Sequence, residues 1–156
     1  MVPKIAHLLL VHYKYDPIAW LIQWKTKSHW NHVAWIWDDK TILECKKSGI
    51  RLAWIDSYDN KKLYSTKKLR ILNLDSKQED VIRRYLINYP KKVNIWKRML
   101  SFLMLAVNSE KDLYELTCSG FIAKGCAKVG IHFDLNKKPS HITPEDINKS
   151  KKVENE

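Results

Sequence analysis

One cysteine of the chain, Cys118, stands in a setting that suits a nucleophile. It lies in the stretch Thr117-Cys-Ser-Gly-Phe121, which we expect to begin a helix. At the first turn of a helix, unpaired backbone N–H groups and the helix dipole favour the thiolate form of a cysteine and lower its pKa. A thiolate can attack a carbonyl carbon. Cys118 is therefore a candidate nucleophile, and the alternative is a small buried thiol that packs like alanine.

A thiol nucleophile needs a base, and the base needs a third group that fixes its tautomer. His32 opens the stretch His32-Val-Ala-Trp-Ile-Trp37, and Glu44 lies in Thr41-Ile-Leu-Glu-Cys-Lys46, with a short polar turn between them. The pattern predicts a β-hairpin, in which alternate side chains share one face. His32 and Glu44 can therefore meet, as base and orienting acid. The alternatives are a histidine bonded to backbone and an acid that faces solvent.

The other two cysteines lack the helix-start setting. Cys45 lies inside a strand, and Cys126 lies two turns further along the same helix as Cys118. We interpret both as buried, structural thiols. An odd number of cysteines without disulfide-like spacing indicates free thiols and a reducing compartment.

Hydrophobic patterning predicts the elements that must hold these groups. Strands are expected at 4–13, 32–37, 41–46, 50–54 and 68–74, and helices at 76–89, 93–107 and 118–130, with a short one opening at Asp16-Pro17 and a last turn at Thr143-Pro144. Ser76 begins a stretch with capping-box spacing, and Pro90 ends that helix. The two glycines of the last long helix, Gly120 and Gly125, indicate close packing.

The order of elements predicts an α+β fold, with a mostly antiparallel sheet packed against helices. A length of 156 residues fits one domain, and 45% apolar residues with seven tryptophans provide a core. We expect a single domain over 1–147 and a polar, disordered tail over 148–156.

The chain is strongly basic, with a formal net charge of +11. Between Lys61 and Arg98 it carries twelve Lys and Arg residues against three acids. Such a face attracts anionic partners, such as nucleic acid, a lipid surface or an acidic wall polymer. The alternative is an ordinary solvated face in a protein whose abundant Lys, Asn and Ile reflect an AT-rich genome.

Four stretches in this order resemble the circularly permuted, NlpC-type papain-like cysteine hydrolases, a family related to lecithin retinol acyltransferase-like enzymes. They are Leu21-Ile-Gln-Trp-Lys-Thr-Lys-Ser28 leading into Asn31-His-Val-Ala-Trp-Ile36, Thr41-Ile-Leu-Glu44 followed by Gly49-Ile-Arg-Leu52, Cys118-Ser-Gly-Phe-Ile-Ala123 with Gly130, and Ile142-Thr-Pro-Glu-Asp-Ile147. The likeness covers the chain from about residue 8 to 147. Permutation accounts for a histidine that precedes the cysteine.

The resemblance implies a permuted papain-like fold, with Cys118 at a helix N-terminus as nucleophile, His32 as base and Glu44 as orienter. It implies an amidase, peptidase or acyltransferase that forms an acyl-thioester, without a cofactor or metal, on a cell-wall peptide or a lipid-linked amide or ester. Residues beside the base and the nucleophile are candidates for substrate contact: Ser28, His29, Trp30, Asn31, Thr117 and Ser119.

Three other functions stay open from the sequence. A nucleic-acid-binding protein could use Lys67, Lys68, Arg70, Arg83, Arg84, Lys91 and Lys92 on phosphates, although no nucleic-acid motif supports it. His29, His32 and Cys118 could bind zinc, although two histidines at this spacing on a strand would point to opposite faces. A catalytically silent member of the same fold could serve as a structural or virion component.

The chain shows no signal for export or membrane insertion. The apolar run Leu8–Val11 is too short for a signal peptide, and the run Met99–Val107 is too short for a membrane span. We therefore expect a cytoplasmic protein, or a virion-associated one if a phage encodes it, with peripheral membrane contact left open.

Overall fold

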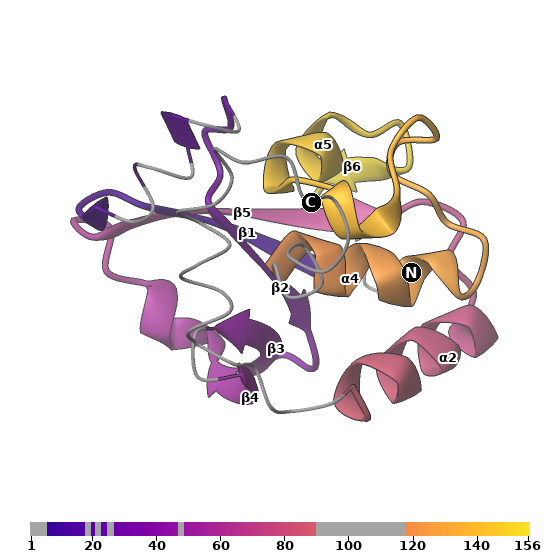
Figure 1. Ribbon diagram of the computed structural model, residues 1–156. Coiled ribbons are helices and arrows are strands. Elements are labelled where there is room, and N and C mark those ends of the chain that lie inside the picture. The colour runs from indigo at the N-terminus through magenta and orange to yellow at the C-terminus, as the bar shows by residue number, and fades with distance from the viewer. Residues whose placement is uncertain (1–5, 18–19, 21–22, 25–26, 47–48, 90–117) are drawn as a thin grey trace.

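The computed structural model describes residues 6–17, 20, 23–24, 27–46, 49–89 and 118–156. Its elements are β1 (Leu8–Tyr13), β2 (His32–Ile36), β3 (Thr41–Lys46), β4 (Gly49–Trp54), the 3-10 turn η1 (Ile55–Tyr58), β5 (Tyr64–Ile71), α2 (Ser76–Ile87), α4 (Cys118–Ala127), the 3-10 turn η2 (Pro139–His141), α5 (Pro144–Lys149) and β6 (Val153–Asn155). Figure 1 shows these elements along the chain. The predicted helix at 93–107 lies outside the described residues.

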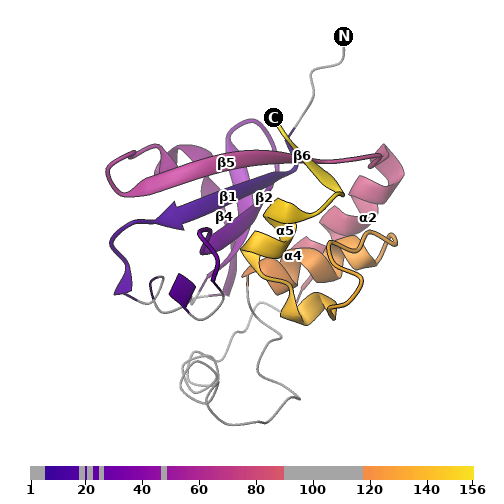
Figure 2. The ribbon, with the colours of Figure 1, turned by 90° about the horizontal axis from the view of Figure 1, so that it is seen from above.

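The six strands form one antiparallel sheet in the order β4-β3-β2-β1-β5-β6. Helices α2, α4 and α5 lie on the same side of this sheet (Figure 2). The predicted α+β class and the predicted antiparallel sheet are therefore confirmed.

Alternation along the strands sorts the apolar side chains into two clusters. The first includes Leu8, Leu10, Val33, Trp35 and Leu43 and packs against α2 and α4. The second uses the intervening positions, on the other face of the sheet; its members are Ala6, Leu9, Val11, Ala34, Ile36, Ile42 and Tyr58. Even-numbered residues of β2, including His32, therefore share a face with the second cluster.

The predicted hairpin is present, since Trp35 pairs with Leu43 and Ile36 with Ile42. Its turn is closed by the carboxylate of Asp38, which accepts hydrogen bonds from the backbone N–H groups of Lys40 and Thr41 at 2.9 and 2.8 Å. An Asx-type turn of this kind fixes the direction in which β3 returns. The hairpin thus sets the register that brings His32 and Glu44 to one face.

Helix α4 packs closely on α2 at Gly125. A Cβ atom added there would stand 2.8 Å from Cδ2 of Leu86, a fully buried side chain of α2. A larger residue would force the two helices apart. The prediction that a glycine of this helix marks close packing is confirmed at this position.

Two predicted element boundaries differ from the structure, those of β5 and the start of α2. Strand β5 spans Tyr64–Ile71 instead of 68–74, because the polar residues before position 68 pair along β1. Helix α2 is capped by Asp75, not by Ser76: its carboxylate accepts from the N–H of Gln78, whose side chain returns to the Asp75 N–H. A carboxylate at this position gains in addition from the helix dipole.

The segment 148–156, expected to be a disordered tail, is ordered instead. Its residues complete α5 and form β6, which pairs with β5 through Ile71 and Val153. The guanidinium of Arg70 forms an ion pair with Glu154 across these strands. Cross-strand pairing and this charge pair offset the low apolar content of the segment.

Candidate active site

The imidazole of His32 lies at the end of the sheet, because His32 is the first residue of β2. In the sheet the His32 residue pairs with Val11 of β1, and only 5% of its surface is exposed. Its Nε2 atom lies 2.8 Å from Oε2 of Glu44. The structure therefore brings together the predicted base and the predicted orienting acid.

The carboxylate of Glu44 is fully buried and surrounded by hydrogen-bond donors. Oε2 accepts from His32 and from the Tyr58 hydroxyl at 2.6 Å, and Oε1 accepts from Nε of Arg51 at 2.9 Å. The ammonium of Lys46 lies 3.6 Å from Oε1. Burial disfavours the charged carboxylate, but the hydrogen bond and charge of His32, the Tyr58 hydroxyl and the Lys46 charge outweigh it and lower the pKa of Glu44 to about 2. Glu44 is therefore ionised at neutral pH.

Cys118 is the first residue of α4, which packs against β2 (Figure 1). Its side chain hydrogen-bonds to His32. Because Nε2 of the ring faces Glu44, Nδ1 is the nitrogen left for the sulfur. Cys118 as a whole residue is 9% exposed.

The protonated form of His32 is strongly favoured. Burial lowers the pKa of the ring, but hydrogen bonds and charge interactions with Cys118 and Glu44 outweigh it and raise the pKa to about 9. An imidazolium between a sulfur and a carboxylate stabilises the thiolate, as does the N-terminus of α4. The arrangement can therefore hold a nucleophile and a proton donor side by side.

These two pKa shifts predict a pH window for stability. The raised pKa of His32 stabilises the fold fully below its ordinary value of 6.5, and this contribution is lost as pH rises through about 9. The lowered pKa of Glu44 stabilises the fold above 4.5, and this contribution is lost as pH falls through about 2. Urea unfolding should therefore give a free energy about 3 kcal/mol lower at pH 10 than at pH 5.5. In His32→Gln most of this difference should vanish; an unchanged difference would contradict the assigned shift.

The residues that surround Glu44 were not predicted from the sequence. Arg51 lies directly opposite Glu44 in the β3–β4 pairing, and Tyr58 reaches it from η1. The rings of Tyr13 and Tyr58 pack edge-on at 6.0 Å, with the Lys46 ammonium 5.5 and 5.1 Å from their centroids. Strand register could have indicated Arg51, since a tight return at Gly49 places it across from Glu44. No local pattern indicates the two tyrosines.

The candidate substrate residues divide by burial. Ser28, Asn31 and Ser119 are buried at 3%, 6% and 2% exposure. Ser28 Oγ donates to the carbonyl of Trp30, and the Asn31 side chain accepts from the Tyr13 N–H at 2.9 Å and donates to its carbonyl at 3.3 Å. Ser28 and Asn31 therefore hold the entry to β2 in place beside His32, instead of lining an open surface.

His29 is exposed and turns to other partners than His32. Its ring stacks on that of His12, with centroids 4.4 Å apart, and its backbone N–H donates to the carboxylate of Glu145 at 3.3 Å. Trp30 is half-buried and packs edge-on against His29. Thr117 lies outside the described residues. In the part of the chain that the structure describes, no three His, Cys, Asp or Glu side chains are grouped to hold a metal ion.

None of the three cysteines, all of which lie among the described residues, forms a disulfide, and Cys45 and Cys126 are buried in the core, at 1% and 0% exposure. Burial raises the pKa of Cys126, which keeps its thiol protonated. Both side chains pack in the first cluster between sheet and helices. Their positions agree with the structural role expected for them.

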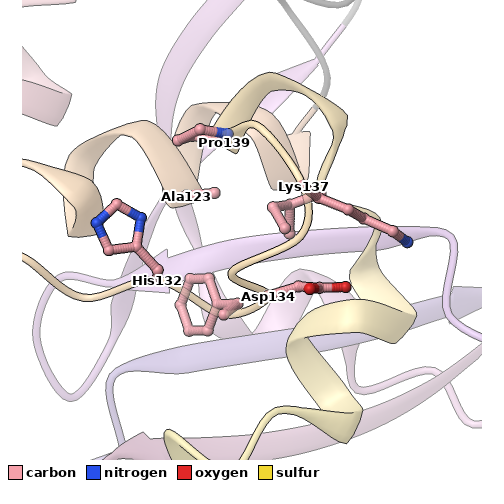
Figure 3. Close-up of a pocket in the computed structure, with 7 residues that line it drawn as sticks. Ala123, His132, Asp134, Lys137 and Pro139 are labelled. Carbon is pink, nitrogen blue, oxygen red and sulfur yellow. The ribbon is translucent and has the colours of Figure 1, made fainter.

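A shallow depression lies between α4 and the segment that follows it. It is lined by Ala123, His132, Phe133, Asp134, Lys137, Pro139 and Ile142, and Figure 3 shows that these come from α4 and the loop around η2. Cys118 does not line it. The depression is thus separate from the Cys118–His32–Glu44 group.

Several cations of the predicted basic face have partners within the fold. Lys67 donates to Asn148 at 2.7 Å, Arg70 pairs with Glu154, and Arg83 pairs with Glu79 and also donates to the Trp37 carbonyl. Lys91 and Lys92 lie outside the described residues. Side chains held in this way are less available for contacts with phosphate groups.

No protein-family model matches this chain, and a search of curated proteins finds no relative. Among the described residues, no helix is both long enough and apolar enough to cross a membrane. The geometry of the site is therefore the basis for assigning a function.

Proposed function

We propose that this protein is a cysteine-dependent hydrolase or acyltransferase, with Cys118 as nucleophile, His32 as base and acid, and Glu44 as orienter. The proposal rests on one observation: the three side chains are buried, and hydrogen bonds link Cys118 to His32 and His32 to Glu44. Each group has the partner that its role requires: the sulfur faces an imidazole, and the imidazole faces an ionised carboxylate.

The mechanism follows from the atoms at the site. The Cys118 thiolate attacks the carbonyl carbon of an amide, ester or thioester, and the Cys118 backbone N–H at the helix start is one donor to the resulting oxyanion. As the bond to the leaving group breaks, His32 gives its Nδ1 proton to the leaving nitrogen, oxygen or sulfur. The acyl group then forms a thioester on Cys118. Water or another acceptor attacks it, His32 takes the attacking group's proton, and the thiolate is released.

Glu44 serves this cycle by holding Nε2 of His32. A carboxylate there fixes the tautomer of the ring and stabilises its charged form. Arg51 and Lys46 limit the basicity of Glu44, so that the proton stays on the imidazole.

We also propose the finer fold assignment, a circularly permuted papain-like domain of NlpC type. Support comes from the histidine and the acid on neighbouring antiparallel strands and the cysteine at the first residue of a helix that packs on the sheet. The chain order, with His32 before Cys118, agrees with a permuted arrangement.

The net charge of +11 favours an anionic substrate. A cell-wall peptide or a lipid-linked amide or ester fits this charge and the proposed chemistry. Association with such a substrate should weaken as the salt concentration rises.

An acyl-enzyme trap tests the proposal directly. The full-length protein is mixed with a panel of short- and long-chain acyl thioesters, aryl esters and peptidyl anilides, then quenched in acid and weighed intact. We expect at least one acyl adduct on Cys118 that hydroxylamine removes, with none on Cys118→Ala. Adducts that persist in Cys118→Ala would contradict the assignment of the nucleophile. Absence of any adduct across the panel would favour a catalytically silent structural or virion component.

A further inference from the structure

Among the residues that the structure describes, the hydroxyl of Tyr58 is the neighbour of Glu44 that shares an oxygen with His32. It donates to Oε2 at 2.6 Å, and His32 Nε2 lies 2.8 Å from the same atom. Tyr58 is 4% exposed, so its hydroxyl meets protein rather than open solvent. Its position is set by η1, whose first N–H, at Ile55, donates to the carbonyl of Lys40 in the hairpin turn at 2.8 Å. The hairpin that carries His32 and Glu44 therefore also positions Tyr58.

The charge of Glu44 fixes the direction of the hydrogen bonds. An ionised carboxylate can only accept, so the single proton of the Tyr58 hydroxyl points to Oε2. The hydroxyl of Tyr13 lies 2.9 Å from that of Tyr58. Since the Tyr58 proton is already committed, Tyr13 must donate and Tyr58 must accept. The described groups form one directed series, from Tyr13 to Tyr58 to Glu44.

This direction excludes a second role for the Tyr13 hydroxyl. Its ring stands beside His32, with centroids 5.8 Å apart, which would otherwise suit a donor to a bound substrate. Its only proton faces Tyr58, and burial further raises the pKa of Tyr13, so this proton is retained. The Tyr13 hydroxyl can therefore influence the imidazole only through the Tyr58 hydroxyl.

We propose that Tyr58 is a positioning residue of the triad, which holds the Glu44 carboxylate in place for His32, and that Tyr13 acts on His32 only through the Tyr58 hydroxyl. The catalytic role of Tyr58 in this inference rests on the proposed function. In this proposal, five side chains linked by hydrogen bonds act together on one nucleophile: Tyr13, Tyr58, Glu44, His32 and Cys118.

Described residues of four elements place titratable groups around the imidazole. Cys118 faces it from α4, Glu44 from β3, Tyr13 from β1 and Tyr58 from η1. Lys46 and Arg51 act on it through Glu44. Removing the Tyr58 hydroxyl takes one hydrogen-bond donor from the Glu44 carboxylate. The carboxylate then attracts the Nε2 proton of His32 more strongly. Loss of this hydroxyl should therefore raise the pH at which His32 titrates.

Histidine NMR titration of isotope-labelled full-length protein tests this inference, with the His32 signal assigned by its loss in His32→Gln. We expect Tyr58→Phe to raise the His32 midpoint by about half a pH unit, and Tyr13→Phe to raise it less. The double variant should have the same His32 midpoint as Tyr58→Phe alone. Once the Tyr58 hydroxyl is removed, the Tyr13 hydroxyl no longer has a path to His32, so removing it as well should change nothing further. Tyr64→Phe is the matched control, since its ring packs on both Tyr13 and Tyr58, at 5.3 and 5.2 Å, and it should leave the midpoint unchanged.

Two outcomes would overturn the inference. One is a His32 midpoint in Tyr58→Phe equal to that of the parent protein. The other is a Tyr13→Phe shift that adds in full to the Tyr58→Phe shift. These readouts need no turnover, so they are separate from the acyl-enzyme trap. Where an adduct forms on Cys118, Tyr58→Phe should also slow its formation about tenfold, with Tyr64→Phe unaffected.

Discussion

Replacing Glu44 by glutamine is expected to lower the free energy of unfolding at pH 6 by about 3 kcal/mol. Within the described parts of the chain, the four polar neighbours of the carboxylate are all donors: His32, Tyr58, Arg51 and Lys46. Glutamine keeps the size of the side chain but offers one acceptor oxygen, and its NH2 group must then face a donor. Arg51 is half exposed and can turn to water, so most of the cost comes from His32 and Tyr58.

Urea unfolding of the parent protein and the variant measures this loss, with Glu79→Gln as the matched control. Glu79 pairs with Arg83 one helical turn away on α2, and 26% of each side chain is exposed. That substitution should cost less than about 0.5 kcal/mol. Equal, small losses in both variants would show that Glu44 is not the buried centre of a charged network.

The hairpin and the pairing of His32 with Glu44 could be predicted from sequence because they depend on local rules. Alternation along the strands put His32 and Glu44 on one face, and the turn at Asp38 fixed their register. A cysteine before an apolar helical stretch indicated the helix start at Cys118. What the sequence could not show is that the helix start meets the end of β2, which depends on packing between segments distant along the chain.

The support around Glu44 was not predicted, because it depends on long-range contacts. Tyr13 and Tyr58 are 45 residues apart, and each is ordinary in its own strand or turn. Their hydroxyls meet only after β1 pairs with β2 and η1 folds back on the hairpin turn. A polar atom that depends on tertiary packing leaves no periodic signal in the sequence.

The ordered C-terminal segment was missed for a different reason. Its composition of Lys, Glu and Asn predicts disorder, and Val153 is its one apolar side chain in β6. Backbone pairing with β5 and the ion pair between Arg70 and Glu154 stabilise it. An edge strand can be polar because only one of its faces needs to be covered.

Substitution of His32 should have the largest effect on reactivity. The proposal requires the His32 imidazolium to hold Cys118 as a thiolate at pH 6. In His32→Gln the thiol loses this charge, and an ordinary thiol is less than about 1% ionised at pH 6. We therefore expect the alkylation of Cys118 by iodoacetamide at pH 6 to slow about 100-fold. The control is His132→Gln, since His132 is exposed and lies beyond the end of α4.

The rate of this alkylation, followed residue by residue with mass spectrometry, shows whether His32 activates Cys118. We expect fast labelling of Cys118 at pH 6 in the parent protein and in His132→Gln, slow labelling in His32→Gln, and little labelling of the buried Cys45 and Cys126 in any folded variant. If Cys118 instead reacts at the same rate with and without His32, the imidazole does not activate the sulfur, and the proposed hydrolase is contradicted.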